Sequence, residues 1–155
     1  MTPWVVGLLG VLAVAVAGIT VGVSRRTGEL TRFRTEAAAL GFSPSNAPGS
    51  AGRVHVVGEW RGRPAVLGYY PGDGGVESSG GETGIWVVVS LRVAEAPAGV
   101  EVWPVERIGR GSTLDLVIRA AWPSGWSGEL GRQQLPLDAG RDELRAALDR
   151  VVPGP

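Results

Sequence analysis

Cysteine and lysine are both absent from this 155-residue chain, and histidine occurs only once, as His55. The lack of cysteine excludes disulfides, thiolate metal sites and thiol catalysis. All fifteen basic residues are arginine, which excludes a Schiff-base lysine and the lysine of a phosphate-binding loop. A single histidine without a cysteine cannot form a usual zinc site, so we expect His55 to be a surface or sheet-face residue. We therefore expect neither a metal nor a cofactor.

An excess of positive charge is also absent, because the formal net charge at pH 7 is zero. A protein that binds nucleic acid through its phosphates needs a strongly basic surface. The sequence therefore predicts no nucleic-acid partner.

Residue combinations that carry catalysis are missing as well. Residues 109–113 contain the glycines of a phosphate loop, but they lack its lysine, and we expect a turn between strands there rather than a following helix. Residues 125–128 lack the spacing of a nucleophile elbow. Asp73 and Glu77 fall short of a calcium-binding loop, and Glu59 would need a second converging carboxylate to act in hydrolysis. The sequence thus predicts a protein that is not an enzyme.

One long apolar run is present, because residues 4–23 contain no charged side chain. At a rise of about 1.5 Å per residue, a helix of this length matches a hydrocarbon core of about 30 Å. Small residues at 15–17 resemble a signal-peptide cleavage site, yet no charged side chain precedes the run and apolar residues continue to Val23. We expect a transmembrane anchor that is not cleaved.

The charges that follow this run predict its orientation. Four arginines lie within a short distance of it: Arg25, Arg26, Arg32 and Arg34. Positive residues beside a span favour the cytoplasmic side, so we expect the N-terminus outside and the C-terminal domain in the cytoplasm, with these arginines against lipid headgroups. Gly18 and Gly22 form a small-residue pair through which two anchors could dimerise weakly.

Composition and period divide the chain into four parts. We expect the anchor and its arginines in residues 1–26, a juxtamembrane helix in 27–42, a linker in 43–52 and an α+β domain in 53–155. Apolar residues at helical spacing place the juxtamembrane helix at 29–40, with Gly41 after its end. This helix continues the anchor directly or with a kink at Gly28, since glycine weakens a helix interior without forbidding it.

The domain itself is predicted to contain about five antiparallel strands and a C-terminal helix. Residues 53–60 and 64–70 flank Gly62-Arg63, which suits a type II′ hairpin turn. Further strands are expected at 85–93, at 100–108 with an edge or bulge at Pro104, and at 113–122. Residues 141–152 carry an apolar helical stripe that is expected to cover the open face of the sheet. Strands followed by one helix indicate an antiparallel α+β domain.

Two segments resemble a family of sequences. Residues 39–42 read Ala-Leu-Gly-Phe, and residues 58–66 read Gly-Glu-Trp-Arg-Gly-Arg-Pro-Ala-Val. Together with one apolar span, this pattern resembles uncharacterised actinobacterial single-span membrane proteins with a small cytoplasmic β-rich domain. The resemblance covers about the first half of the domain and implies the architecture alone, because it brings no activity or ligand.

These features lead to two hypotheses of function. The first is an adaptor that holds a small domain at the cytoplasmic membrane surface and binds another protein. Its candidate contacts are Trp126 in a loop, Arg61 and Arg63 in the hairpin, and the glycine-rich segment 71–84. The alternative is a module that senses lipid headgroups or a small ligand at the membrane, in which the hairpin arginines join the juxtamembrane arginines.

Overall fold

The computed structural model describes residues 3–47, 53–72, 83–91, 97–122 and 129–154. In the first helix, the side chains of residues 3–13, 16 and 18–22 also lie outside the description. The chain divides into two compact units, Met1–Arg32 and Phe33–Pro155.

Helix α1 runs from Pro3 to Ala39 without a break at Gly28. It ends in a Schellman motif, in which the Phe42 N–H donates to the Ala37 carbonyl and the Gly41 N–H donates to the Ala38 carbonyl. Gly41 has φ +89°, a left-handed conformation that favours glycine, so its predicted place after the helix is confirmed. Among the residues that the structure describes, none of the helices combines the length and the apolar character needed to cross a membrane.

Within the described residues, six antiparallel strands form one sheet in the order β1-β2-β3-β4-β6-β5. The strands are β1 Ser43–Pro44, β2 Val54–Trp60, β3 Arg63–Tyr70, β4 Gly84–Leu91, β5 Glu101–Pro104 and β6 Glu129–Leu135. The antiparallel α+β class is therefore confirmed, with six strands rather than about five. Pro104 ends the edge strand β5, as its missing N–H favours, and the 3₁₀ helix η2 (Val105–Arg107) follows it.

The tip of the β2–β3 hairpin differs from the prediction. Trp60 pairs with Arg63, so the two loop residues are Arg61 and Gly62 instead of Gly62 and Arg63. Arg61 has φ +51° and Gly62 has φ +73°, which is the pattern of a type I′ turn rather than type II′. The shift by one residue places Arg63 in the first position of β3.

Two further corrections concern the second half of the domain. The segment predicted as a strand at 113–122 forms helix α2, Thr113–Ala121, and a helix therefore does follow residues 109–113. Ser112 caps this helix by accepting a hydrogen bond from the Asp115 N–H at 3.2 Å. Strand β6 was not predicted, because Leu130 and Leu135 are the only two strongly apolar side chains in it.

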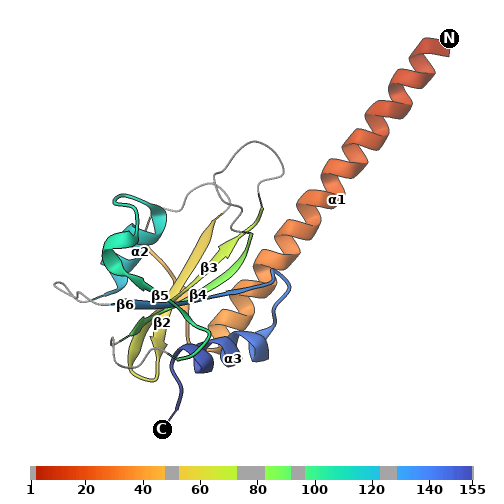
Figure 1. Cartoon of the computed structure of the whole chain (residues 1–155). Coiled ribbons are helices and arrows are strands. Elements are labelled where there is room, and N and C mark those ends of the chain that lie inside the picture. Colours follow the sequence, from red (N-terminus) through yellow and green to blue (C-terminus); the bar gives the residue numbers. More distant parts are fainter. Residues whose placement is uncertain (1–2, 48–52, 73–82, 92–96, 123–128, 155) are drawn as a thin grey trace. The chain divides into compact units, whose positions relative to one another are not determined.

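Helices cover both faces of the sheet. Leu144, Ala147, Leu148 and Val151 of α3 (Arg141–Val151) are buried, and α3 packs on β4 and β6, which confirms the predicted helix and its stripe. Phe33 and Ala37 at the end of α1 are buried as well, and Phe33 contacts the ring of Tyr69. On the opposite face, α2 packs on β2 and β3 (Figure 1), and Val117, Ile118 and Trp122 join a core cluster with Val66 and Val88.

Strand β4 lies at the centre of this arrangement. It pairs with β3 on one side and with β6 on the other, and all eight of its residues are buried. Both faces are core, because α3 and α2 cover the two sides of the sheet.

Candidate binding site

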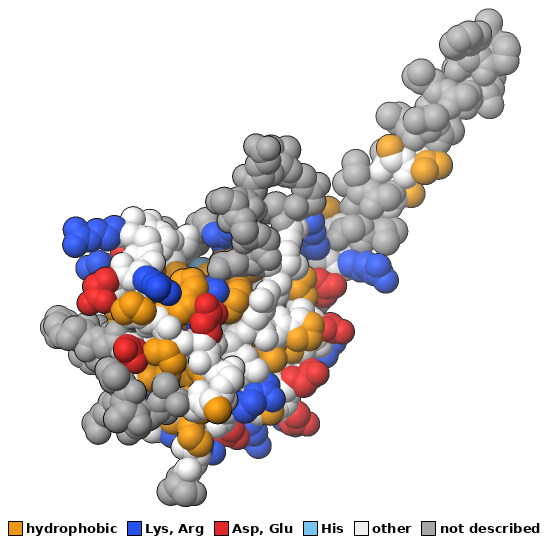
Figure 2. All heavy atoms as spheres, in the orientation of Figure 1, with side chains coloured by type: hydrophobic (Ala, Val, Ile, Leu, Met, Phe, Trp, Pro, Cys, Tyr) orange, Lys and Arg blue, Asp and Glu red, His pale blue; other side chains and the backbone are white. Residues whose placement is uncertain are grey.

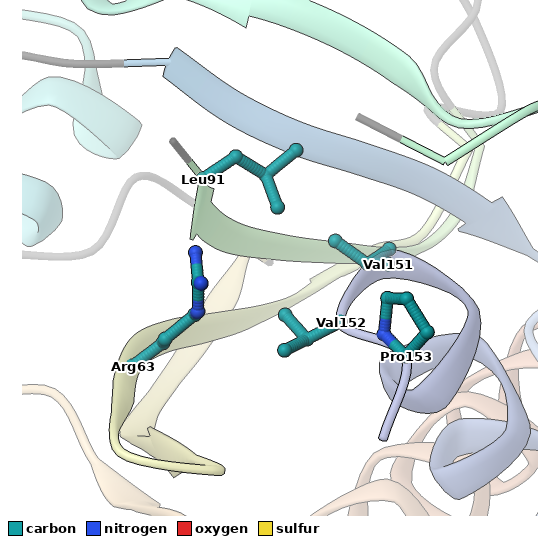
Figure 3. Close-up of a pocket in the computed structure, with 5 residues that line it drawn as sticks. All are labelled: Arg63, Leu91, Val151, Val152 and Pro153. Carbon is teal, nitrogen blue, oxygen red and sulfur yellow. The ribbon is translucent and has the colours of Figure 1, made fainter. Parts of the chain in front are cut away.

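A cavity of about 210 Å³ lies where the β2–β3 hairpin, the end of β4 and the end of α3 meet (Figure 3). Its lining consists of one arginine and four apolar residues: Arg63, Leu91, Val151, Val152 and Pro153. The close-up shows Arg63 rising on one side of the hollow and the residues from α3 and the tail facing it from another side. The cavity therefore combines a cationic wall with aliphatic walls.

Hairpin geometry places Arg63 at this cavity. Arg63 and Trp60 are paired across the hairpin, so both side chains lie on the α3 face of the sheet. The Arg63 side chain is half-buried, and its Nη1 donates to the Ser90 carbonyl at 3.4 Å. Ser90 precedes Leu91 at the end of β4, which brings the guanidinium beside the apolar part of the lining.

Arg61 holds the other side of the same junction. Its Nη2 lies 2.8 Å from Asp149 Oδ1, and its Nη1 donates to the Val152 carbonyl at 3.0 Å. Trp60 Nε1 donates to the same Asp149 oxygen at 3.0 Å. We call these four residues, Trp60, Arg61, Asp149 and Val152, the clasp. The clasp fixes the hairpin tip to the end of α3. Arg61 therefore already pairs with residues of its own domain, Asp149 and Val152.

The residues that line this cavity include none of the other predicted contacts. Arg25, Arg26, Arg32 and Arg34 have exposed side chains on α1. Trp126, most of the 71–84 segment, Asp73 and Glu77 lie outside the described residues, and the description does not cover the packing around Gly18 and Gly22. Glu59 is exposed on β2. Among the described residues, no three His, Asp or Glu side chains gather closely enough to hold a metal ion.

Two tryptophans and one arginine form a stack on the opposite face of the sheet. The Arg132 guanidinium carbon lies 3.7 Å from the ring centroids of both Trp86 and Trp103. Glu101 accepts hydrogen bonds from Arg132 Nε and Trp103 Nε1. This arrangement joins β4, β6 and β5 through cation–π contacts. The cation over both rings is Arg132 of the protein itself, so the stack serves to hold the sheet together.

His55 is buried, which corrects the part of the prediction that placed it at the surface. It lies on the same sheet face as this stack, and its Nε2 is 2.8 Å from the Tyr70 hydroxyl. Burial, and then the positive charge of Arg53, lower the pKa of His55 from 6.5 to about 4. His55 is therefore neutral at pH 7 and belongs to the hydrogen-bonded core.

Comparison with protein-family models, with curated proteins and with solved structures finds no match. The resemblance to actinobacterial membrane proteins therefore stays an expectation. The cavity has to be interpreted from its own residues. The sequence indicated Arg63 and the apolar stripe of α3 with Val151 as separate features. It did not indicate that they line one cavity, because the hairpin tip and the end of α3 lie about ninety residues apart in the chain.

Proposed function

We propose that this protein is a single-pass membrane-anchored adaptor whose α+β domain binds another protein at the cytoplasmic surface. The supporting observation is the path of α1. The uncharged run of residues 4–23 and the arginines that follow it belong to one continuous helix, Pro3–Ala39. The last turns of that helix contribute Phe33 and Ala37 to the core of the domain.

This path limits how far the domain can lie from the end of the apolar run. Phe33 follows Val23 by ten positions in the chain. These ten positions span about 15 Å as a helix and at most about 36 Å when fully extended. A domain on so short a connection meets partners that are themselves at the membrane, which suits an accessory subunit.

The surface of the domain agrees with a protein partner rather than a nucleic acid. Figure 2 shows acidic and basic side chains interspersed over the visible face, with hydrophobic side chains between them. Mixed charge of this kind gives no field of one sign. Arg61 is held in the clasp by residues of the domain itself. Trp126 and the 71–84 segment are therefore better candidates for contact with a partner than the hairpin tip is.

Affinity purification of the tagged full-length protein from its native membrane in mild detergent tests this proposal. The expected result is recovery in the membrane fraction after alkaline washing, together with a stoichiometric protein that Trp126→Ala releases. Arg145→Ala is the control, because Arg145 is exposed on α3 and far in sequence from the candidate contacts. Release of the chain by alkaline washing would contradict the anchor, and recovery of the chain alone would contradict the adaptor.

A second function, recognition of lipid headgroups, is favoured by the exposed arginines of α1. Arg25, Arg26, Arg32 and Arg34 all follow the apolar run within eleven residues of Val23. A basic residue near an anionic leaflet contributes about 1 kcal/mol. In nanodiscs, full-length protein with all four arginines changed to glutamine should lose its preference for phosphatidylglycerol over phosphatidylcholine. An unchanged preference would count against this function.

A further inference from the structure

The cavity at the end of α3 has the size and lining of a site for a small amphipathic molecule. Arg63 supplies a guanidinium, and Leu91, Val151 and Val152 supply aliphatic walls (Figure 3). A volume of about 210 Å³ is smaller than the roughly 300–1,000 Å³ of pockets that hold drug-sized ligands. The space therefore suits a small molecule with one polar end.

We propose that this cavity binds a carboxylate that carries a short branched aliphatic group. The planar guanidinium of Arg63 can pair with a carboxylate through two N–H groups, because these groups form a fork. The aliphatic walls remove the branched tail from water. This chemistry is shared by a free branched-chain acid and by the C-terminal valine or leucine of a polypeptide. The inference does not depend on the membrane anchor or the adaptor.

One contact of Arg63, with Ser90, is weak enough to be exchanged for a carboxylate. Its hydrogen bond to the Ser90 carbonyl is 3.4 Å long, beyond the usual 2.7–3.2 Å for N–H···O bonds. A carboxylate can therefore replace a weak contact by a charge-assisted one. We do not require Arg63 to lack other interactions, because a guanidinium has five N–H donors to distribute.

The negative end of the α3 helix dipole disfavours an anion in the cavity, so its effect on binding has to be compared with the effect of Arg63. The negative end of a helix dipole weakens the binding of a nearby anion by about two- to fivefold. A charge-assisted hydrogen bond strengthens binding by about tenfold or more. Moreover, Arg61 already donates to the Val152 carbonyl at 3.0 Å, so the clasp offsets part of the negative charge at the helix end. The favourable contact with Arg63 is the larger effect.

Titration of the full-length protein in detergent micelles with sodium 3-methylbutanoate tests the proposal. The readout is methyl NMR of valine and leucine, together with the Nε–H signals of arginine. We expect saturable shifts at Leu91, Val151 and Val152 with a Kd of about 1 mM, as a ligand of this size allows. Val66 and Val117, which lie in the cluster on the other face, should not shift.

Two comparisons isolate the role of charge. In the unaltered protein, 3-methylbutanamide has the same shape without the charge, and it should bind at least fivefold more weakly. Arg63→Gln should weaken binding of the acid by at least fivefold, whereas Arg145→Gln, on the exposed side of α3, should leave it unchanged. Shifts that do not saturate, that spread over both faces, or that are equal for acid and amide would overturn the proposal, whether or not Arg63→Gln folds.

A final titration separates the two sources of the ligand. Acetyl-glycyl-leucine with a free carboxylate is compared with 3-methylbutanoate under the same conditions. Tighter binding of the peptide by tenfold or more assigns the cavity to the C-terminus of a polypeptide. Binding of 3-methylbutanoate with no binding of the peptide assigns it to a free acid. Both results support the proposed chemistry, and it is rejected if neither compound binds.

Discussion

At the scale of single residues, His55 shows how burial changes a titratable group. Its ring packs edge-on against Tyr70 with the centroids 5.4 Å apart, and its Nε2 is within hydrogen-bonding distance of the Tyr70 hydroxyl. Arg53 lies over the same Tyr70 ring, 5.1 Å from its centroid. A positive charge on His55 would be desolvated and close to that of Arg53. These two effects make the folded state prefer the neutral imidazole.

This preference predicts a loss of stability in mild acid. The pKa of His55 is lowered from 6.5 to about 4, so between these values the unfolded chain binds a proton that the folded protein does not. Its contribution to the free energy of unfolding is therefore complete above about pH 6.5 and decreases toward pH 4, by at most about 3 kcal/mol. Urea unfolding of the full-length protein in micelles at pH 7.5 and pH 4.5 measures this difference.

The matched variant for this measurement is His55→Gln, which keeps a hydrogen-bonding group and does not titrate. It should show a much smaller difference in the free energy of unfolding between the two pH values. Asp115 does not confuse the comparison, because the Gly111 N–H lowers the pKa of its carboxyl below 3.8. An equal pH dependence in the variant and in the natural protein would reject the role of His55.

Gly68 lies beside His55 and Tyr70, and the packing of these two rings requires that Gly68 has no side chain. A Cβ atom at Gly68 would lie 2.5 Å from Cε2 of Tyr70 and 3.2 Å from Cδ2 of His55. Gly68→Ala should therefore lower the free energy of unfolding by about 1–3 kcal/mol, as overpacking of a core does. Gly109→Ala is the control, because a Cβ there meets no atom within 4 Å, and it should change stability by less than about 0.5 kcal/mol. Equal losses in thermal or urea unfolding would contradict this account.

At the scale of elements, α2 shows why alternation alone misleads. Thr113–Ala121 alternates in the manner of a strand, yet Leu114, Val117 and Ile118 also have helical spacing. The start of the segment decides between the two periods. Ser112 accepts from the Asp115 N–H, while Asp115 accepts from the Gly111 N–H at 3.0 Å and from Arg119 Nε at 2.7 Å. The bond from the Asp115 N–H satisfies a donor at the helix N-terminus, and the i,i+4 pair of Asp115 and Arg119 forms on the surface of a helix. Neither has a counterpart in a strand.

The cap makes a prediction for this element. Ser112→Ala should lower the free energy of unfolding by about 1 kcal/mol, because the Asp115 N–H loses its acceptor. Ser43→Ala serves as the comparison, since Ser43 is exposed in the edge strand β1 and the change should cost less than about 0.5 kcal/mol. Urea unfolding measures both variants. If the two serines behave alike, the cap does not stabilise α2.

Strand β6 is the opposite case to α2, because it is a strand whose own sequence lacks the pattern of a strand. It holds one central and one edge strand together, because it pairs with β4 on one side and with β5 on the other. Its sequence nevertheless contains a glycine, an arginine and two glutamines. Gly131 is needed for packing, since a Cβ there would lie 2.5 Å from Cγ1 of Val151. Neighbouring elements therefore make this segment a strand, rather than its own apolar pattern.

At the scale of the whole molecule, the order of the strands predicts where the domain opens last. Strand β4 is buried along its full length and has paired strands on both sides, whereas β1 and β5 are the edges of the described sheet. Hydrogen exchange of the full-length protein should therefore be slowest in β3 and β4 and fastest in β1 and β5. Faster exchange in β4 than in β5 would contradict the layered core.

The positions of the candidate site came only partly from the sequence. Arg61 and Arg63 were singled out as hairpin residues, and the apolar stripe of α3 was predicted with its correct members. The sequence did not indicate that Arg61 meets Asp149 and Val152, or that Arg63 lies near Val151 across a cavity. Local patterns report periodicity along one element, whereas these contacts depend on how two distant elements are placed by the sheet.

The sequence by itself determined the features that rest on neighbouring residues: the uncharged run at 4–23, the glycine end of α1, the β2–β3 pairing and the buried stripe of α3. Chemistry excluded by composition, such as disulfides, also needed nothing more. Only the structure decided that α2 is a helix, that β6 lies beside β4, and that the clasp joins the hairpin tip to the end of α3. The last two depend on hydrogen bonds and packing between residues far apart in the chain, which local propensity does not encode.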